Sequence, residues 1–309
     1  PGVVSAAYEE EKMGLPFQCS YEAACILQDK SRFRQFLSEN GFNSPKAKGY
    51  SVAEDALKDV DYFNWPVIVK PVDSAGSKGV TKVSSPEQLP EAIERALGAS
   101  ISKNFIIEDF LEKVGFSVGS ESFVVDGRLK YNGFYDQYFD DESVNPYTPS
   151  AEVWPSSLGQ KYQDEIKAEL QRLVDLLGIR TGLFNVECRV CKDGKTYLME
   201  VSPRAGGNRL AEMLNYAADV NIIEAETRKA LNMELSEIHE PNYNGHYAIL
   251  VMHSTLSGIF DGLWIDDRFR SEHIIEEELR VKKGAVVSAF TGANAAIGTL
   301  FLKFNTRYE

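Results

Sequence analysis

A β-hairpin signal near the middle of the chain constrains the fold more than any other feature of the sequence. Two short apolar runs, residues 182–191 and 196–201, are joined by Lys192-Asp193-Gly194-Lys195. An Asp-Gly pair between two such runs is the strongest short-range signal for an antiparallel hairpin closed by a two-residue type I′ turn. The sequence therefore predicts a hairpin in which Lys192 pairs with Lys195.

This register places charged and polar side chains directly opposite one another. Glu187 falls opposite Glu200, and Asn185 falls opposite Ser202. Cβ atoms of opposed residues lie about 5 Å apart, and like charges there are destabilising. A hard cation such as Mg²⁺ or Mn²⁺, which prefers oxygen ligands, would relieve the repulsion. Two alternatives remain: a solvent-exposed hairpin whose carboxylates repel weakly in water, and a one-residue bulge at the turn that breaks the register.

A glycine-rich segment follows an earlier apolar run that contains a lysine. Residues 65–71 read as a buried strand with Lys70 near its end, and residues 73–80 are rich in Ser and Gly. Backbone N–H groups of such a loop can form an anion-binding concavity, because glycine adopts positive φ. The segment has neither the Walker A nor the Rossmann glycine spacing. A plain turn is the alternative, but Lys70, Lys78 and the downstream Arg204 together indicate a polyphosphate site.

In this order the motifs resemble those of the ATP-grasp superfamily, which includes biotin carboxylase, carbamoyl-phosphate synthetase and the amino-acid and D-alanine ligases. Residues 29–45 are similar to the family's first lysine helix, and residues 67–80 to its second lysine strand and flexible lid loop. Residues 105–111 resemble the hinge that binds adenine, and either Ser117 or Glu121 on the next strand would reach the ribose. The resemblance implies the following ATP-binding residues: Lys30, Lys70, Ser74, Gly76, Ser77, Lys78, Gly79, Glu108, Asp109, Phe110, Leu111, Ser117 and Glu121.

The resemblance also assigns roles around the predicted hairpin. Glu187 and Glu200 are similar to the family's paired metal carboxylates, and Ser202 stands where the family usually has an asparagine that ligates metal. A serine hydroxyl can coordinate at this position, although more weakly. Arg204 is similar to the phosphate-binding arginine, whose planar fork suits phosphate or carboxylate. Arg209 is a second candidate for gripping these groups.

Composition sets limits on the class of protein. The chain has 309 residues, which is enough for about two domains, and its 43% apolar and 26% charged residues are an ordinary globular balance. The net charge of −13 and the pI near 4.9 oppose nonspecific nucleic-acid binding, which relies on basic surface. The sequence contains no run of about 18 apolar residues, which is the length that a membrane-spanning helix needs. We therefore expect a cytoplasmic protein that acts on small molecules, without a nucleic-acid or membrane partner, and with a homodimer as an open alternative.

The cysteines and histidines do not indicate a catalytic centre. Cys188 and Cys191 have the spacing of some metal and redox sites, but on a strand they point to opposite faces. Cys19 and Cys25 are separated by five residues, a gap that is not typical of zinc ligands. We therefore expect four reduced, structural cysteines. The four histidines all lie in the last quarter of the chain, away from the predicted site.

Turn residues and the resemblance together divide the chain into four units of an α/β (α+β) fold. Residues 1–45 are predicted to hold one strand remnant and two helices: a remnant of the α/β domain that normally precedes the family's lysine helix, of which residues 1–25 resemble only the last piece, and the linker helix. We therefore expect a fragment of a longer protein, with a natural short form as the alternative. Residues 46–103 form a mobile lid subdomain, residues 104–240 the main subdomain with the metal site, and residues 241–309 a β-rich C-terminal subdomain.

Several helix boundaries carry clear local signals. Gly41 is suited to end the second N-terminal helix, because a residue with positive φ commonly follows a helix. Ser85 followed by proline predicts the start of a helix that Gly98 closes. Residues 160–177 form a helix that stops before a glycine, and another helix begins near Arg209.

The resemblance implies an ADP-forming carboxylate–amine ligase that uses ATP and Mg²⁺ to activate a carboxylate as an acyl-phosphate. Substrate choice would lie in the segment 134–154, whose acidic and aromatic residues suit a cationic amine, with a solvated loop as the alternative. These residues are Asp136, Tyr138, Asp140, Asp141 and Glu142. Two other classes remain open: a bicarbonate-using carboxylase or carbamoyl-phosphate-type enzyme, and a non-catalytic nucleotide-binding module.

Overall fold

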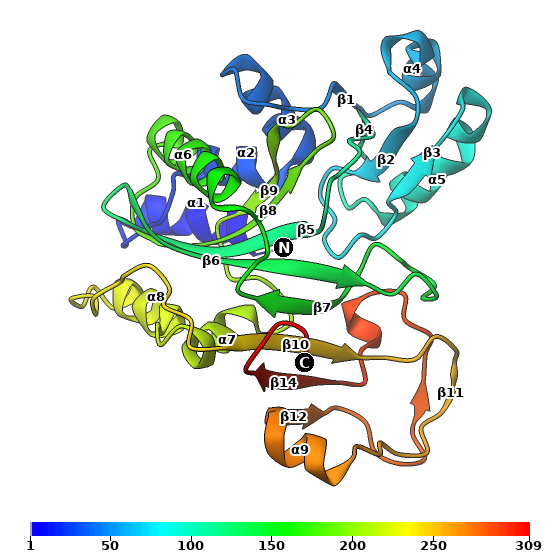
Figure 1. Ribbon diagram of the computed structural model, residues 1–309. Helices are drawn as coiled ribbons and strands as arrows, with labels where there is room; N and C mark the ends of the chain where they lie inside the picture. Colours follow the sequence, from blue (N-terminus) through cyan, green and yellow to red (C-terminus); the bar gives the residue numbers. More distant parts are fainter. Residues whose placement is uncertain (1) are drawn as a thin grey trace.

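The protein is built around two β-sheets, as seen in the computed structural model, which describes residues 2–309 (Figure 1). A small sheet with its own helices lies at the upper right of the view, and a large sheet runs through the middle. The helices nearest the N-terminus lie at the upper left. This arrangement agrees with the predicted mixed α/β fold.

The N-terminal segment is helical. It contains α1 (Val3–Met13), α2 (Tyr21–Gln28) and α3 (Lys30–Glu39). The predicted strand remnant is wrong, because the Ala, Glu, Lys and Met residues of the first segment favour a helix. Asp29 joins α2 to α3, and its carboxylate caps α3 by accepting hydrogen bonds from the N–H groups of Ser31 and Arg32. α3 ends before Gly41, which has a φ of 72°, as predicted.

The small sheet has the strand order β1-β4-β2-β3. These strands are β1 (Ala47–Tyr50), β4 (Phe105–Asp109), β2 (Val67–Pro71) and β3 (Thr81–Val83). α4 (Ala53–Lys58) and α5 (Leu89–Ala99) belong to the same unit, and α5 packs against β2. The core of this unit includes Val69, Ile93 and Ile107.

Two boundaries in this unit differ from the predictions. β4 lies between β1 and β2, so the sheet extends beyond the predicted limit at residue 103. The cause is long-range pairing such as Val69 opposite Ile107, which no local signal reveals. α5 begins only after the 3₁₀ turn Pro86–Gln88, and it continues through Gly98 to Ala99.

The large sheet has eight strands in the order β12-β14-β10-β7-β6-β5-β8-β9 within residues 2–309. In chain order they are β5 (Ser117–Val125), β6 (Arg128–Phe139), β7 (Pro149–Trp154), β8 (Gly182–Val190), β9 (Thr196–Ser202), β10 (His246–Met252), β12 (Ile274–Leu279) and β14 (Gly298–Phe304). β10 pairs with both β7 and β14. The strands of the segment 241–309 therefore continue the main sheet, which differs from the separate β-rich subdomain that we predicted.

The smaller elements include a two-stranded sheet, a short helix and two 3₁₀ turns. β11 (Gly258–Ile259) pairs with β13 (Val286–Val287), and α9 (Asp267–His273) precedes β12. Two further 3₁₀ turns are Val60–Tyr62 and Ala293–Ala295.

Helices cover both faces of the large sheet. α6 (Gln160–Leu177) and the N-terminal helices pack on one face, and α7 (Leu210–Ala217) and α8 (Ile222–Ala230) pack on the other. The bounds of α6 match the prediction, and Gly178 ends it with a φ of 61°. In the part of the chain that the structure describes, no helix is long and apolar enough to cross a membrane.

Candidate active site

The hairpin brings the predicted carboxylates together, although its turn differs from the prediction. The backbone N–H of Cys191 donates to the carbonyl of Lys195 (3.0 Å), and Gly194 has a φ of 77°, so three residues rather than two form the loop. This extra residue alone would have broken the predicted register. However, β9 contains a compensating irregularity next to Glu187, so Glu187 still lies opposite Glu200.

The register beyond this irregularity is the predicted one. Asn185 lies opposite Ser202, so the carboxylates, the amide and the hydroxyl share one face of β8 and β9. The Ser202 hydroxyl donates to Oε1 of Glu200 (3.2 Å) and accepts a hydrogen bond from Nε2 of Gln28 (3.1 Å). Gln28, at the end of α2, is a contact that the sequence did not indicate.

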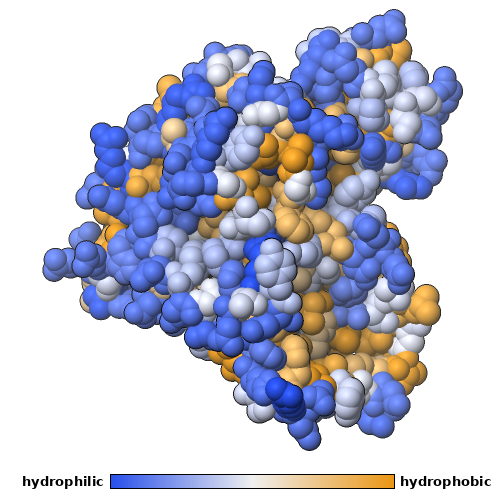
Figure 2. All heavy atoms as spheres, viewed as in Figure 1, coloured by the Kyte–Doolittle hydropathy of each residue, from blue (hydrophilic) through white to orange (hydrophobic). Residues whose placement is uncertain are grey.

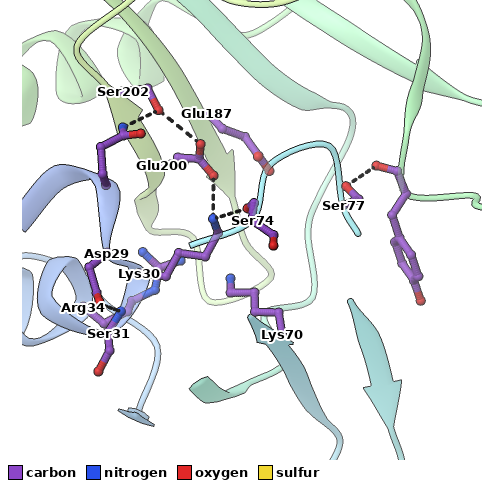
Figure 3. Close-up of polar contacts among 12 residues, drawn as sticks. Asp29, Lys30, Ser31, Arg34, Lys70, Ser74, Ser77, Glu187, Glu200 and Ser202 are labelled. Atoms are coloured by element: carbon purple, nitrogen blue, oxygen red, sulfur yellow. Dashed lines mark hydrogen bonds and ion pairs between the residues drawn. The ribbon is translucent and has the colours of Figure 1, made fainter. Parts of the chain in front are cut away.

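Lys30 connects three elements at the junction between the sheets (Figure 3). The Asp29 cap makes Lys30 the first residue of α3, and the backbone N–H of Lys30 donates to the carbonyl of Val72 just after β2 (3.0 Å). Its Nζ donates to the carbonyl of Ser74 (2.9 Å) and lies 3.5 Å from Oε2 of Glu200. The predicted first lysine, glycine loop and second carboxylate therefore meet at one point.

The charges around Glu200 keep this carboxyl group ionised. Burial opposes its ionisation, but the positive charges of Lys30, Arg204 and Lys70 outweigh that effect and lower its pKa. The side chains of Lys30 and Glu200 are 17% and 30% exposed, so both remain accessible from the surface. The space-filling view shows a hollow between the small unit and the part of the molecule below it (Figure 2).

Glu187 has a partner that the sequence analysis did not identify. Nη2 of Arg189 lies 2.9 Å from Oε1 of Glu187. Arg189 is two residues further along β8, so strand alternation could have placed it on this face. Lys113 also lies close to this pair, and its pKa is lowered by burial and by the charge of Arg189. Nζ of Lys113 donates to the hydroxyl of the buried Ser117 (3.3 Å), one of the two ribose candidates.

The second lysine, Lys70, belongs to a buried charge cluster. Glu108 on β4 accepts hydrogen bonds from Nζ of Lys70 and from Nε of Arg34 on α3, the latter at 2.9 Å. Burial raises the pKa of Glu108, but the charges of Arg34 and Lys70 outweigh it and hold that pKa well below its usual range. Glu108, predicted at the adenine hinge, thus links α3, β2 and β4.

The other hinge candidates also have contacts within the protein. The carboxylate of Asp109 accepts hydrogen bonds from the backbone and the side chain of Asn64 (2.9 and 2.7 Å). Nζ of Lys82 lies 3.8 Å from the centre of the Phe110 ring, and Leu111 packs against a small cluster that includes Cys191. These contacts fix the path of the segment after β4.

The glycine loop adopts the backbone conformation that its composition predicts. Gly76, Gly79 and Ser77 all have positive φ, at 69°, 72° and 56°. The Ser77 hydroxyl donates to the carbonyl of Tyr147 (2.9 Å), in the loop before β7 (Figure 3). The loop therefore reaches from the small unit to the loop between β6 and β7, while Lys78 is exposed.

Two of the remaining candidates lie in the segment that follows β9, and a third, on β5, contacts that segment. Nη1 of Arg204 donates to the carbonyl of Ala205 (2.6 Å), and the charge of Arg204 acts on Glu200. The guanidinium of Arg209 instead pairs with three carboxylates, those of Glu212, Glu276 and Glu278. The other ribose candidate, Glu121, is fully buried and accepts hydrogen bonds from the backbone N–H of Gly206 (3.1 and 3.0 Å). Arg204 is thus better placed than Arg209 to contact a ligand.

Two side chains of the acidic segment before β7 have structural partners. Asp136 is fully buried, and Ser156, Ser157 and Arg307 all donate to it. Asp140 lies 2.8 Å from Nε2 of His253. Asp136 is therefore not available to a cationic amine.

Thiol chemistry has no support in the described residues. All four cysteines are free, and burial raises the pKa of Cys19 to about 12 and that of Cys191 to about 11. Between residues 2 and 309, no three His, Cys, Asp or Glu side chains are grouped so as to hold a metal ion.

Comparison with known proteins finds a domain match and distant relatives. Residues 63–212 match the family described as the ATP-grasp domain. The chain is 26% identical over 212 residues to the C-terminal section of the carbamoyl phosphate synthase large chain of Aquifex aeolicus, covering 68% of this chain and 38% of that protein. It is 26% identical over 220 residues to the carbamoyl phosphate synthase large chain of Thermotoga neapolitana, covering 71% of this chain and 19% of that protein. The chain thus spans well under half the length of these relatives.

Solved structures share the fold over nearly the whole chain. An L-amino acid ligase from Bacillus licheniformis has a TM-score of 0.80 at 20% identity, covering 100% of this chain and 74% of that one. Biotin carboxylase from Campylobacter jejuni has a TM-score of 0.71 at 18% identity, covering 98% of this chain and 69% of that one. The domain match and the shared fold agree with the order of motifs read from the sequence: residues 63–212 match the ATP-grasp domain, and the chain shares the fold of these structures.

Proposed function

We propose that this protein is an ATP- and Mg²⁺-dependent ligase that activates a carboxylate as an acyl-phosphate for attack by an amine or a similar nucleophile. The observation that carries the proposal is the meeting of Lys30, the Ser74 carbonyl and Glu200 at one point between the two sheets. A lysine there can neutralise phosphate, and the glycine loop above it can supply backbone N–H groups.

The hairpin face fits a hard cation. Glu187, Glu200 and Ser202 offer only oxygen atoms, and Mg²⁺ usually binds one or two carboxylates together with water and substrate phosphates. A cation held by Glu187 and Glu200 would neutralise the charge of bound phosphate groups. Arg189 would then have to share Glu187, because its guanidinium holds one oxygen of that carboxylate.

The residues of the chain have separable tasks in the proposed reaction. Lys30 would exchange its contact with the Ser74 carbonyl for a phosphate oxygen, while Lys70 adds positive charge from its buried position. Arg204 would grip the transferred phosphoryl group or the substrate carboxylate through its planar fork. The glycine loop would exclude water from the acyl-phosphate. Since the buried thiols are poor nucleophiles, we expect no covalent intermediate between the acyl group and the protein.

A bicarbonate-using enzyme is the second candidate, because the sequence relatives named above are carbamoyl phosphate synthases. In that case bicarbonate would be the carboxylate that is phosphorylated. ATP hydrolysis that depends on bicarbonate, without any added organic acid, would separate this candidate from an amino-acid or other carboxylate ligase.

The proposal is tested by measuring ATP turnover against pooled carboxylates and pooled amines. We expect ADP and phosphate as products, and oxygen-18 from the labelled carboxylate should appear in the phosphate. AMP and pyrophosphate, or unlabelled phosphate, would reject the acyl-phosphate route. Nucleotide binding with no turnover in any pool would instead favour a non-catalytic nucleotide-binding module.

A further inference from the structure

Two glutamates are almost completely buried on the face of the large sheet that carries the candidate metal carboxylates. Glu121 on β5 is 0% exposed, and Glu152 on β7 is 2% exposed. Their opposite residues on β6, Gly133 and Gln137, are four positions apart, so both carboxyl groups point to the same face. Burying a carboxyl group is costly unless it is hydrogen-bonded, so the partners of these two groups indicate what they do.

Both carboxyl groups bind one segment, residues 204–209, which joins β9 to α7 and which we call the Arg204–Arg209 loop. The backbone N–H of Gly206 donates to both oxygens of Glu121. Nδ2 of Asn208 donates to Oε1 of Glu152 at 2.9 Å. Within residues 2–309, Oε2 of Glu152 has no hydrogen-bond partner. The carboxyl group of Glu152 is therefore committed to the loop through Asn208.

The backbone of this loop needs such restraints. Asn208 and Arg209 are consecutive residues with φ of 53° and 62°, a left-handed conformation that costs energy for residues with a side chain. Strained residues of this kind persist only where the surroundings impose the conformation. Gly206 lies so close to Glu121 that an added Cβ would come within 2.6 Å of Oε1. The loop is thus held at Gly206, at Asn208 and, through ion pairs, at Arg209.

The position of the loop matters because Arg204 begins it. The charge of Arg204 acts on both Glu200 and Glu121, so its guanidinium lies near the candidate metal site and near one of the two buried glutamates. Burial raises the pKa of Glu152 to about 7, which shows how little compensation this carboxyl group receives apart from Asn208. If this position served only to fill the core, a leucine could be buried here at lower cost than a glutamate.

We propose that Glu152 is a positioning residue of the active site: through Asn208 it holds the Arg204–Arg209 loop in its left-handed conformation and so sets Arg204 beside Glu200. The role in the reaction rests on the ligase function proposed above. The role in holding the loop does not, because it follows from the hydrogen bond, the burial and the backbone conformation alone.

Hydrogen exchange tests the loop directly. The amides of Gly206 and Leu210 report on it, since they donate to Glu121 and to the Gly207 carbonyl. We expect Glu152→Leu and Asn208→Ala to speed their exchange at least tenfold. Glu152→Gln should restore slow exchange, because its amide oxygen can still accept from Asn208. Glu224→Gln is the matched control, as Glu224 pairs with Arg228 on the surface of α8.

The outcomes separate the positioning role from the ligase proposal. Exchange within twofold of wild type in both Glu152→Leu and Asn208→Ala would overturn the positioning role, and Asn208→Ala decides alone if Glu152→Leu does not fold. With a substrate in hand, both variants should raise KM for the carboxylate at least tenfold while the affinity for Mg²⁺-ADP stays within twofold. Equal loss of both affinities would contradict positioning. If the wild type shows no ligase activity, the exchange result still stands and only the ligase proposal fails.

Discussion

The charge cluster of Glu108, Arg34 and Lys70 gives the sharpest prediction about stability. Glu108 is 3% exposed, and it is the acceptor for two buried cations that come from α3 and from β2. In Glu108→Gln, Arg34 and Lys70 stay buried without a counter-charge. Removing one partner of a buried ion pair typically costs about 3–5 kcal/mol. Two terminal nitrogens of Arg34 already have no partner among the described residues, so the guanidinium has no other acceptor nearby to replace Glu108.

The assay is urea unfolding of the wild type and Glu108→Gln, followed by calorimetry. We expect the free energy of unfolding to fall by about 3–5 kcal/mol and the melting temperature by roughly 5–15 °C. Glu91→Gln is the control, because Glu91 forms an exposed pair with Arg95 on α5 and should change little. The double variant Glu108→Gln with Lys70→Met should recover part of the loss, since it removes one unpaired cation.

The reasoning fails if Glu108→Gln lies within about 1 kcal/mol of the wild type. That result would mean that Arg34 and Lys70 reach water or other acceptors in solution. It would also return Glu108 to the set of residues free to contact a nucleotide base.

Two further predictions concern pH and the glycine loop. Burial raises the pKa of Glu121 and of Glu152 to about 7, so the stability linked to their protonated forms is fully present below about pH 4.5 and is lost as the pH rises through 7. Urea unfolding at pH 5 and pH 8 should show this fall, and Glu152→Gln should reduce it by on the order of 3 kcal/mol; an unchanged pH dependence would contradict the pKa shift. The amides of Ser74–Val80 should exchange quickly without nucleotide and slow down with Mg²⁺-ATP, because the loop tip is largely exposed and the Ser77 hydroxyl binds it to the loop before β7; equally slow exchange in both states would indicate a static turn.

The hairpin site could be predicted from the sequence partly because its signals are local. The Asp-Gly pair and the strand alternation gave the correct opposition of Glu187 and Glu200, although the loop holds three residues. A second irregularity in β9 restored the register, and neither deviation has a sequence signal that we recognised. Arg189 could have been placed beside Glu187 by the same alternation, since it is two residues away on the same strand.

The remaining differences come from contacts between distant residues. The resemblance assigns Glu108 to the adenine hinge, and no local pattern reveals its charge cluster, because its partners Arg34 and Lys70 are 74 and 38 residues away in the chain. β10 joins the large sheet by pairing with β7, which lies about a hundred residues earlier, so local patterns suggested a separate unit. Helix ends were predicted well where a glycine with positive φ stops the helix, as at Gly178.

The central claim is that Lys30, Glu187 and Glu200 form a nucleotide and metal site, and calorimetric titration with a non-hydrolysable ATP analogue tests it most directly. The wild type should bind the analogue at least tenfold more tightly with Mg²⁺ than without it. Glu200→Gln should lose this dependence on Mg²⁺ and keep a melting temperature close to that of the wild type, while Glu224→Gln behaves as the wild type. Tight binding with the same dependence on Mg²⁺ in Glu200→Gln, or no binding by the wild type, would contradict the account.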